Sequence, residues 1–307
     1  MPRATAFGLD VASNAPLSFL EGASAAETGR SLELAYQEAG EPPWPDEGRL
    51  IADQRDRDGS VVFQIEAGDA GYRIHGPAYG CNVISGDGRH LRGTAGADGL
   101  AGWQRLLVAQ ALPFAAVLQG LEVLHASAVV VDGRAILLAG ASGVGKTSAA
   151  LALQRLGATL LADDVVALEL AEGGLLAHPG APIAGIDSEE VERLGEDGAG
   201  LGPILATNAR ERVSRADLAS APAPVGRLYL LRRAVEEAGP PSVDEEVDPR
   251  ELLTSTFNLV LESPRRLVAL LEVCARLAAA GAERVTCGPG TDPDELASFL
   301  LRRLGER

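Results

Sequence analysis

Lysine is almost absent from this sequence of 307 residues. Lys and Arg together number 27, and Lys146 is the only one of them that is lysine. A lysine differs from an arginine in carrying a compact, point-like ammonium group instead of a planar guanidinium fork. The position of Lys146 is therefore the first place to search for specific chemistry.

Cysteine is scarce as well. Cys81, Cys274 and Cys287 are far apart and show neither CxxC nor metal-ligand spacing. The sequence thus gives no indication of a disulfide framework or a structural zinc site. We expect three reduced and buried thiols without a functional role.

Excess positive charge and long apolar runs are also missing. The net charge of −16 would repel nucleic-acid phosphates and anionic lipids. The most apolar helical stretch, residues 103–124, is interrupted by Gln, Arg and Pro, which disfavours a membrane span. The N-terminus lacks the basic start and apolar core of a secretory signal. We therefore expect a cytoplasmic protein without nucleic-acid or membrane partners.

The first hundred residues differ in pattern from the rest of the chain. They are rich in Gly, Asp and turn signals. The alternating stretches 61–68, 71–76 and 81–93 predict strands of a small antiparallel sheet. We expect a mainly-β accessory domain over residues 1–100.

The remaining residues, 101–307, mix strand and helix patterns and predict one larger α/β domain. Helices are predicted over 101–120, 249–280 and 292–304. The Pro-rich segments 220–226 and 237–249 are expected to be surface loops.

Residues 140–147, GASGVGKT, fit the phosphate-binding pattern GxxxxGK[ST] between an apolar run and a helical pattern. Glycines let consecutive backbone N–H groups face one anion, and the helix N-terminus adds its dipole. Lys146 would reach the β- and γ-phosphates of ATP, and the hydroxyl of Thr147 would bind Mg²⁺. The predicted nucleotide-binding residues are Gly140, Ser142, Gly143, Val144, Gly145, Lys146, Thr147 and Ser148. The alternative is a glycine-rich turn without a ligand.

A predicted hairpin precedes the loop and determines the expected position of a histidine. Asp132-Gly133 joins two apolar runs and is a strong two-residue hairpin signal. If Val131 faces Arg134, the same register sets His125 opposite Gly140. His125 would then lie at the edge of the loop with a functional role, and the alternative is a half-buried strand histidine bonded to backbone.

Two adjacent carboxylates follow the helix that begins in the loop. That helix should end near Leu156-Gly157, and residues 158–162 should return as a strand beside the one that precedes the loop. Asp163 and Asp164 would follow this strand and point to opposite faces, so they cannot do the same work. One would hold Mg²⁺ and the other would accept a proton from an attacking hydroxyl. The alternative is a solvated strand end.

From His125 through GASGVGKTS to LLADDVVAL, the chain resembles the catalytic domain of HPr kinase/phosphorylase and related kinases, including those that phosphorylate lasso-peptide precursors. This resemblance implies an α/β P-loop kinase domain with the mixed sheet shared with phosphoenolpyruvate carboxykinase. It also implies Asp164 as the general base, His125 and Lys146 as further active-site residues, and Thr147 and Asp163 as Mg²⁺ ligands.

Three functions remain open at this point. The resemblance favours an ATP- and Mg²⁺-dependent kinase that phosphorylates a serine of a protein or ribosomal peptide. A kinase of a small metabolite would use the same site. A nucleotide-binding switch without phosphotransfer is the third, because residues 180–195 do not match the family's later glycine-rich signature. The sequence leaves a homo-oligomer open.

Overall fold

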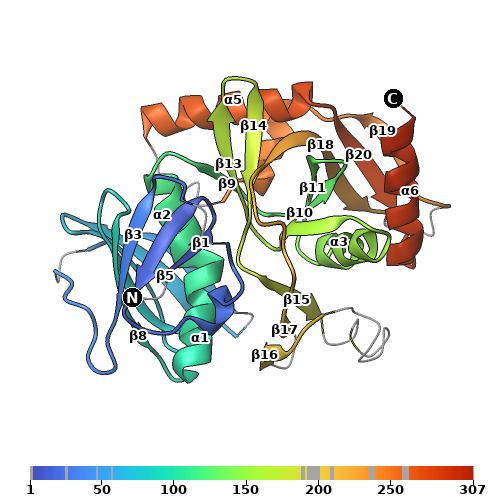
Figure 1. Ribbon diagram of the computed structural model, residues 1–307. Coiled ribbons are helices and arrows are strands. Elements are labelled where there is room, and N and C mark those ends of the chain that lie inside the picture. Colours follow the sequence, from blue (N-terminus) through green and yellow to red (C-terminus); the bar gives the residue numbers. More distant parts are fainter. Residues whose placement is uncertain are drawn as a thin grey trace. The chain divides into compact units, whose positions relative to one another are not determined.

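The computed structural model shows two compact units (Figure 1). The described residues are 3–24, 27–45, 48–56, 58–187, 191, 201–207, 211–234, 239–257 and 263–306. One unit is formed by Met1–Leu121 and the other by Glu122–Phe257 together with Ser263–Arg307.

The first unit is built on one mixed sheet. Among the described residues this sheet has eight strands in the order β1-β2-β3-β8-β7-β6-β5-β4. The strands are β1 (Arg3–Ala6), β2 (Leu9–Ser13), β3 (Ser31–Tyr36), β4 (Arg49–Arg55), β5 (Val61–Gly68), β6 (Gly71–Gly76), β7 (Gly80–Ile84) and β8 (His90–Ala95). The strands predicted over 61–68 and 71–76 are confirmed, and the stretch 81–93 contains most of β7 and β8.

The sheet is not wholly antiparallel, as the sequence had suggested. Strands β4 to β8 pair antiparallel in chain order, whereas β3 is parallel to both β2 and β8. A long connection that includes the 3-10 helix η1 (Ser18–Leu20) separates β2 from β3. A connection of that length returns the chain in the same direction, which a tight hairpin cannot do.

The helix predicted over 101–120 is present in three parts. They are α1 (Gly99–Leu106), the π-helical turn η2 (Leu107–Ala111) and α2 (Leu112–Leu118). Pro113 has no N–H to donate, and the wider turn in front of it accommodates that loss. All three parts belong to the first unit, which therefore extends to Leu121, beyond the boundary expected at residue 100.

The second unit contains a mixed sheet that carries the glycine-rich loop. Among the described residues this sheet has nine strands, with the order β12-β10-β11-β18-β14-β13-β9 and with β20 beside β18 and β19. The strands are β9 (Glu122–Leu124), β10 (Ala126–Val131), β11 (Arg134–Gly140), β12 (Thr159–Ala162), β13 (Val166–Ala171), β14 (Gly174–His178), β18 (Ala223–Arg233), β19 (Ser242–Glu246) and β20 (Ala282–Cys287). A separate small sheet, in the order β15-β17-β16, is made of β15 (Ile183–Asp187), β16 (Ile204–Thr207) and β17 (Glu211–Arg215).

Helices cover both faces of the large sheet. On β11, Leu137 packs in the core that includes α5 (Pro264–Ala279), and its neighbour Leu138 packs in the core that includes α3 (Lys146–Arg155) and α6 (Pro293–Gly305). Successive strand residues face opposite sides, so an apolar run such as β11 is what a doubly covered strand requires. In the described part of the chain, no helix has both the length and the hydrophobicity needed to cross a bilayer.

The hairpin before the loop has the predicted register. Val131 pairs with Arg134, and the ladder continues to Ala126 opposite Ala139. The expectation for β12 was wrong, because β12 pairs with β10 and not with β11. Both edges of β11 are already occupied, one by β10 and the other by the parallel strand β18.

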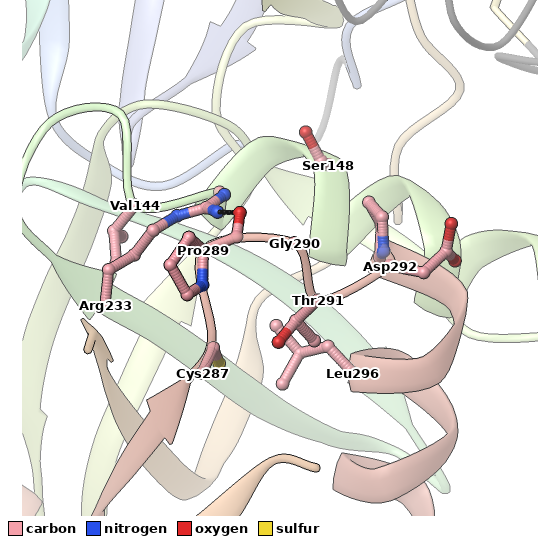
Figure 2. Close-up of a pocket in the computed structure, with 11 residues that line it drawn as sticks. Val144, Ser148, Arg233, Cys287, Pro289, Gly290, Thr291, Asp292 and Leu296 are labelled. Atoms are coloured by element: carbon pink, nitrogen blue, oxygen red, sulfur yellow. Dashed lines mark hydrogen bonds between the residues drawn. The ribbon is translucent and has the colours of Figure 1, made fainter. Parts of the chain in front are cut away.

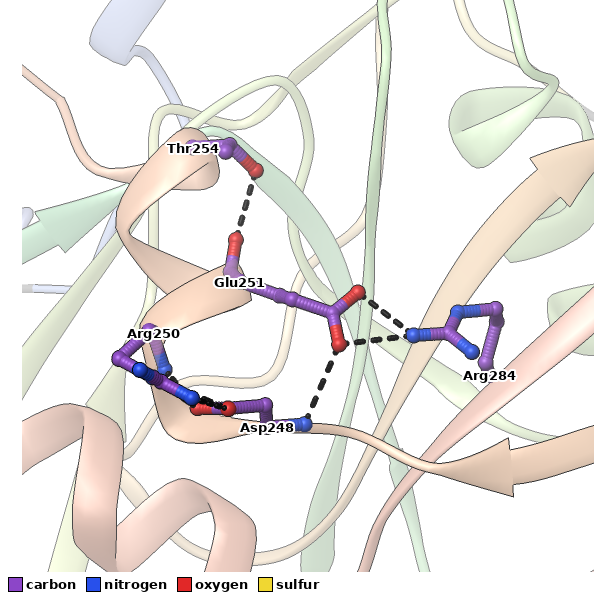
Figure 3. Close-up of polar contacts among 5 residues, drawn as sticks. All are labelled: Asp248, Arg250, Glu251, Thr254 and Arg284. Carbon is purple, nitrogen blue, oxygen red and sulfur yellow. Dashed lines mark hydrogen bonds and ion pairs between the residues drawn. The ribbon is translucent and has the colours of Figure 1, made fainter.

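The acidic segment 237–249, expected as a surface loop, contains β19 and leads into the 3-10 helix η3 (Pro249–Ser255). Asp248 accepts a hydrogen bond from the N–H of Arg250, and Glu251 accepts one from the N–H of Asp248 (Figure 3). Glu251 also receives Nη2 of Arg284 from β20 at 2.6 and 2.7 Å. These reciprocal caps give a short helix a fixed beginning. The segment 220–226 was likewise expected as a loop, but β18 begins within it, at Ala223.

The three cysteines all lie in the described part of the chain; they are buried and are not joined in disulfides, as expected. Burial raises the pKa of the Cys81 thiol to about 12 and that of Cys274 to about 11. Thiols with such pKa values hold little thiolate at neutral pH and are poor nucleophiles.

Candidate active site

The glycine-rich loop connects β11 to α3, in the order that the motif requires. Backbone φ is positive at Gly140 (139°), Gly143 (75°) and Gly145 (102°), where residues with a side chain are strained. A Cβ at Gly140 would also lie 2.5 Å from the carbonyl oxygen of Leu231 on β18. Since α3 starts directly after the loop, the N–H groups of its first turn have no acceptor inside the helix. The loop and helix end together suit an anion.

Lys146 is the first residue of α3, and only 7% of it is exposed. Its Nζ donates to the carbonyl oxygens of Gly140 (3.0 Å) and Ala141 (3.2 Å). Burial lowers the pKa of the ammonium group, while the nearby Asp164 and Asp163 raise it. Both hydrogen-bond acceptors are neutral, so among the described residues this charge has no direct ion-pair partner.

Asp163 is held by three donors from three elements. Its Oδ1 accepts the hydroxyls of Ser127 on β10 (2.7 Å) and Thr147 on α3 (2.8 Å), and its Oδ2 accepts the N–H of Gly185 on β15 (3.0 Å). Burial raises the pKa of this carboxyl, and the hydrogen bond from Ser127 lowers it. The carboxylate is fixed in place next to the hydroxyl of Thr147.

Asp164 lies in a strained turn beyond the end of β12. Its φ is 67°, and the turn is closed by a hydrogen bond from the N–H of Val165 to the carbonyl of Asp163 (2.8 Å). A three-residue turn with positive φ at its centre is rare and costs about 1–3 kcal/mol. The two carboxylates are therefore not successive strand residues, but the turn still separates their environments: the Asp164 side chain is 38% exposed.

His125 lies between β9 and β10 and approaches Asp164. Its Nδ1 is 3.4 Å from Oδ1 of Asp164, and its backbone N–H donates to the carbonyl of Ser255 (2.7 Å). The ladder of the hairpin stops at Ala126, so His125 does not pair with Gly140 as the register had predicted. At this point the chain passes from β9, at one edge of the sheet, to β10, which lies between β12 and β11. Burial lowers the pKa of the imidazole, Asp164 raises it and Lys146 lowers it.

A cavity of about 490 Å³ brings these side chains together. Of the predicted site residues, it is lined by His125, Ser142, Gly143, Gly145, Lys146, Thr147, Ser148, Asp163 and Asp164. Gly140 contributes its carbonyl to Lys146, and Val144 lines a smaller neighbouring cavity. Residues separated by dozens of positions in the sequence thus share one space in the second unit.

The sequence reasoning missed several residues of this site. Ser127 and Gly185 hold Asp163, and Ile186, Asp187 and Arg233 complete the cavity wall. Ser127 had a detectable signal, since it is the polar residue in the otherwise apolar run of β10. The others had none, because they arrive through strand pairings between distant segments.

The predicted magnesium ligands Thr147 and Asp163 are adjacent in space. Among the described residues, no group of three or more His, Cys, Asp or Glu is arranged to hold a metal ion by itself. Mg²⁺ does not need such a group, because it uses one or two protein oxygens, water and substrate phosphates. One carboxylate and one hydroxyl beside the glycine-rich loop fit that donor set.

No protein-family model matches the chain, and no curated protein matches it. Among solved structures, the HPr(Ser) kinase/phosphatase from Coxiella burnetii is similar to it with 17% sequence identity and a TM-score of 0.30. The match covers 60% of this chain and 90% of the other chain.

Proposed function

We propose that the chain is a kinase that transfers the γ-phosphoryl group of ATP, in the presence of Mg²⁺, to a serine hydroxyl of a protein or ribosomal peptide. The observation that carries this proposal is one cavity that combines a glycine-rich loop, a lysine whose hydrogen-bond acceptors are both neutral, and two carboxylates in different environments. Phosphoryl transfer depends mainly on positioning and on neutralising charge, and these groups supply both.

The loop and Lys146 would bind the phosphates. The ammonium group now rests on two loop carbonyls and would exchange those neutral acceptors for phosphate oxygens. Thr147 and Asp163 would hold Mg²⁺, which neutralises charge on the β- and γ-phosphates when it is bound. The hydrogen bonds from Ser127 and Gly185 hold the Asp163 carboxylate beside the hydroxyl of Thr147.

Asp164 would act as the general base. It is the more exposed carboxylate, and it faces the cavity where an acceptor can reach it. In the transfer step, the serine Oγ–H proton passes to the Asp164 carboxylate while Oγ bonds to the γ-phosphorus. The bond from the γ-phosphorus to the bridging oxygen breaks, and ADP leaves. His125, 3.4 Å from Asp164, would orient this carboxylate.

Other parts of this proposal rest on the sequence. The net charge of −16 would repel nucleic-acid phosphates and anionic lipids, which supports an enzyme without nucleic-acid or membrane partners. A serine-bearing polypeptide is the proposed acceptor because the resemblance to the HPr kinase family favours it.

The test is transfer of γ-labelled phosphate from ATP into an extract of the native host, separated by size. Asp164→Asn should keep ATP binding and lose transfer, because asparagine cannot take the proton. Asp132→Asn is a matched control: Asp132 also has positive φ (48°), but it lies in the β10–β11 turn outside the cavity. Asparagine tolerates that backbone conformation, so both variants should fold.

A polypeptide labelled by the unmutated chain and the control, but not by Asp164→Asn, supports the proposal. Label only in small molecules would replace it with a metabolite kinase. ATP binding without any transfer would favour a nucleotide-binding switch, and near-normal transfer by Asp164→Asn would exclude Asp164 as the base.

A further inference from the structure

A second cavity of about 230 Å³ lies beside the glycine-rich loop in the second unit (Figure 2). One side is formed by Val144 and Gly145 of the loop and by Ser148 of α3. The other side is formed by the segment between β20 and α6, with Pro289 and Gly290 among its lining residues. No step of phosphoryl transfer described above uses this space.

The two cavities share part of their walls. Gly145, Ser148 and Arg233 line the second cavity as well as the larger one that contains Lys146. The two cavities are therefore adjacent, and a molecule with phosphates bound at Lys146 would have its other end next to the second cavity. Its volume is just below the usual range for small-molecule sites, about 300–1,000 Å³, so it would hold a compact group with one side still open to solvent.

The lining of the second cavity combines apolar carbon with polar and charged groups, among them Arg233 and Asp292, and so favours a group with both apolar and polar surface. Val144 (7% exposed) and Leu296 (5% exposed) supply aliphatic carbon, and Pro289 and Pro293 add ring carbons. The hydroxyls of Ser148 and Thr291 are polar groups of the kind that orient a ligand in its site. A nucleobase has apolar faces and a polar edge, which is the same combination.

Arg233 marks the border between the two cavities. It is the last residue of β18, and its Nη1 donates to the carbonyl oxygen of Pro289 (2.6 Å) (Figure 2). A Cβ at Gly145 would lie 3.5 Å from its Nη2, so the guanidinium group is next to the loop backbone. Arg233 thereby fixes the β20–α6 segment and keeps a positive charge at the border between the two cavities.

We infer that this cavity is the nucleoside subsite: the base of the nucleotide lies between Val144 of the loop and the Pro289–Thr291 segment, and Arg233 contacts the phosphates at the border. This inference rests on the proposed function, because it requires that the larger cavity bind the phosphates of a nucleotide.

Gly290 permits a direct test. It has no positive φ, and a Cβ there would have no heavy atom within 4 Å, so Gly290→Leu adds bulk at the cavity wall without straining the chain. Gly173→Leu is the matched control, because Gly173 has the same open surroundings in the β13–β14 turn and lines neither cavity. The affinities for ATP and for inorganic tripolyphosphate are measured by calorimetry with Mg²⁺.

Gly290→Leu should weaken ATP binding by about tenfold or more and leave tripolyphosphate binding within about twofold. Gly290→Ala should weaken ATP binding less, and Gly173→Leu should change neither affinity. Unchanged ATP binding by Gly290→Leu, or an equal loss for both ligands, would overturn the nucleoside subsite and leave the proposed function intact. If the unmutated chain bound neither ligand, the proposed function itself would fail, and the inference with it.

Discussion

The cavity at the glycine-rich loop and the segment around η3 both bring acidic and basic side chains close together. The η3 cluster consists of Asp248, Arg250, Glu251 and Arg284 (Figure 3). Each of its carboxylates receives both a guanidinium group and a backbone N–H. The hydrogen bonds from Arg250 lower the pKa of Asp248 to about 2. These charges are compensated within the chain.

The charged groups of the loop cavity are arranged differently. Lys146 donates to carbonyl oxygens only, and His125 and Asp164 are 3.4 Å apart with more than a third of each side chain exposed. Asp164 also occupies a backbone conformation that costs free energy. Backbone strain at Asp164 and a buried ammonium group with neutral acceptors are features expected of a site that receives an anionic ligand, whereas a compensated cluster stabilises the fold. The comparison thus marks the loop cavity as the candidate binding region more clearly than charge density does.

Lys146→Ala should give the largest effect. Without the ammonium group, ATP-dependent transfer should fall by about 10³-fold. The free energy of unfolding should not fall, because a buried cation with a lowered pKa contributes little stability. Initial rates and urea unfolding measure the two quantities.

Lys146→Arg tests whether the positive charge alone is sufficient. It keeps the positive charge but replaces a point charge with a planar fork, and we expect most of the activity to be lost. If Lys146→Ala transferred phosphate at a near-normal rate, the loop cavity would not be the site of chemistry.

The parts of the site that could be predicted from the sequence are local in the chain. The strand, glycine loop and helix follow one another, and the Asp132-Gly133 turn fixes the register of β10 and β11. Periodicity also predicted α5 and α6. In these elements the structure is determined mostly by residues that are close together in the sequence.

The parts that could not be predicted depend on contacts between distant segments. Gly185 reaches Asp163 from β15, and Arg233 reaches the loop because β18 pairs in parallel with β11. A sequence shows neither which strand fills the second edge of β11 nor where β12 then pairs. In the first unit, the parallel position of β3 was missed for the same reason.

Arg266→Ala should give the next largest effect, now on stability. Arg266 on α5 pairs with Glu122 on β9 at 3.3 Å, and the side chains are 10% and 5% exposed. Removing the guanidinium leaves a buried carboxylate without its counter-charge, a loss of about 3–5 kcal/mol at neutral pH. Arg265→Ala, at the exposed neighbouring position, is the control and should be nearly neutral.

This loss should depend on pH in a defined direction. Burial raises the pKa of Glu122 in the folded chain, while Arg266 lowers it. Stability linked to a raised carboxyl pKa is complete below the unfolded pKa, about 4.3, and is lost as pH rises through the higher folded value. Without Arg266 the pKa of Glu122 in the folded chain rises further. Arg266→Ala should therefore lower the free energy of unfolding more at pH 8 than at pH 5. Glu122→Gln added to Arg266→Ala should remove this pH dependence, and urea unfolding across the range checks it.

Arg284→Ala should have the smallest effect, because its partner Glu251 is 40% exposed and water can replace part of the lost interaction. We expect a loss of about 1 kcal/mol in the free energy of unfolding, with Arg302→Ala on the exposed side of α6 as a nearly neutral control. Transfer activity should stay unchanged, since the η3 cluster lines neither cavity. A large loss of transfer with intact stability would mean that the compensated charges of the η3 cluster also take part in the chemistry. Charge compensation would then not distinguish the η3 cluster from the loop cavity.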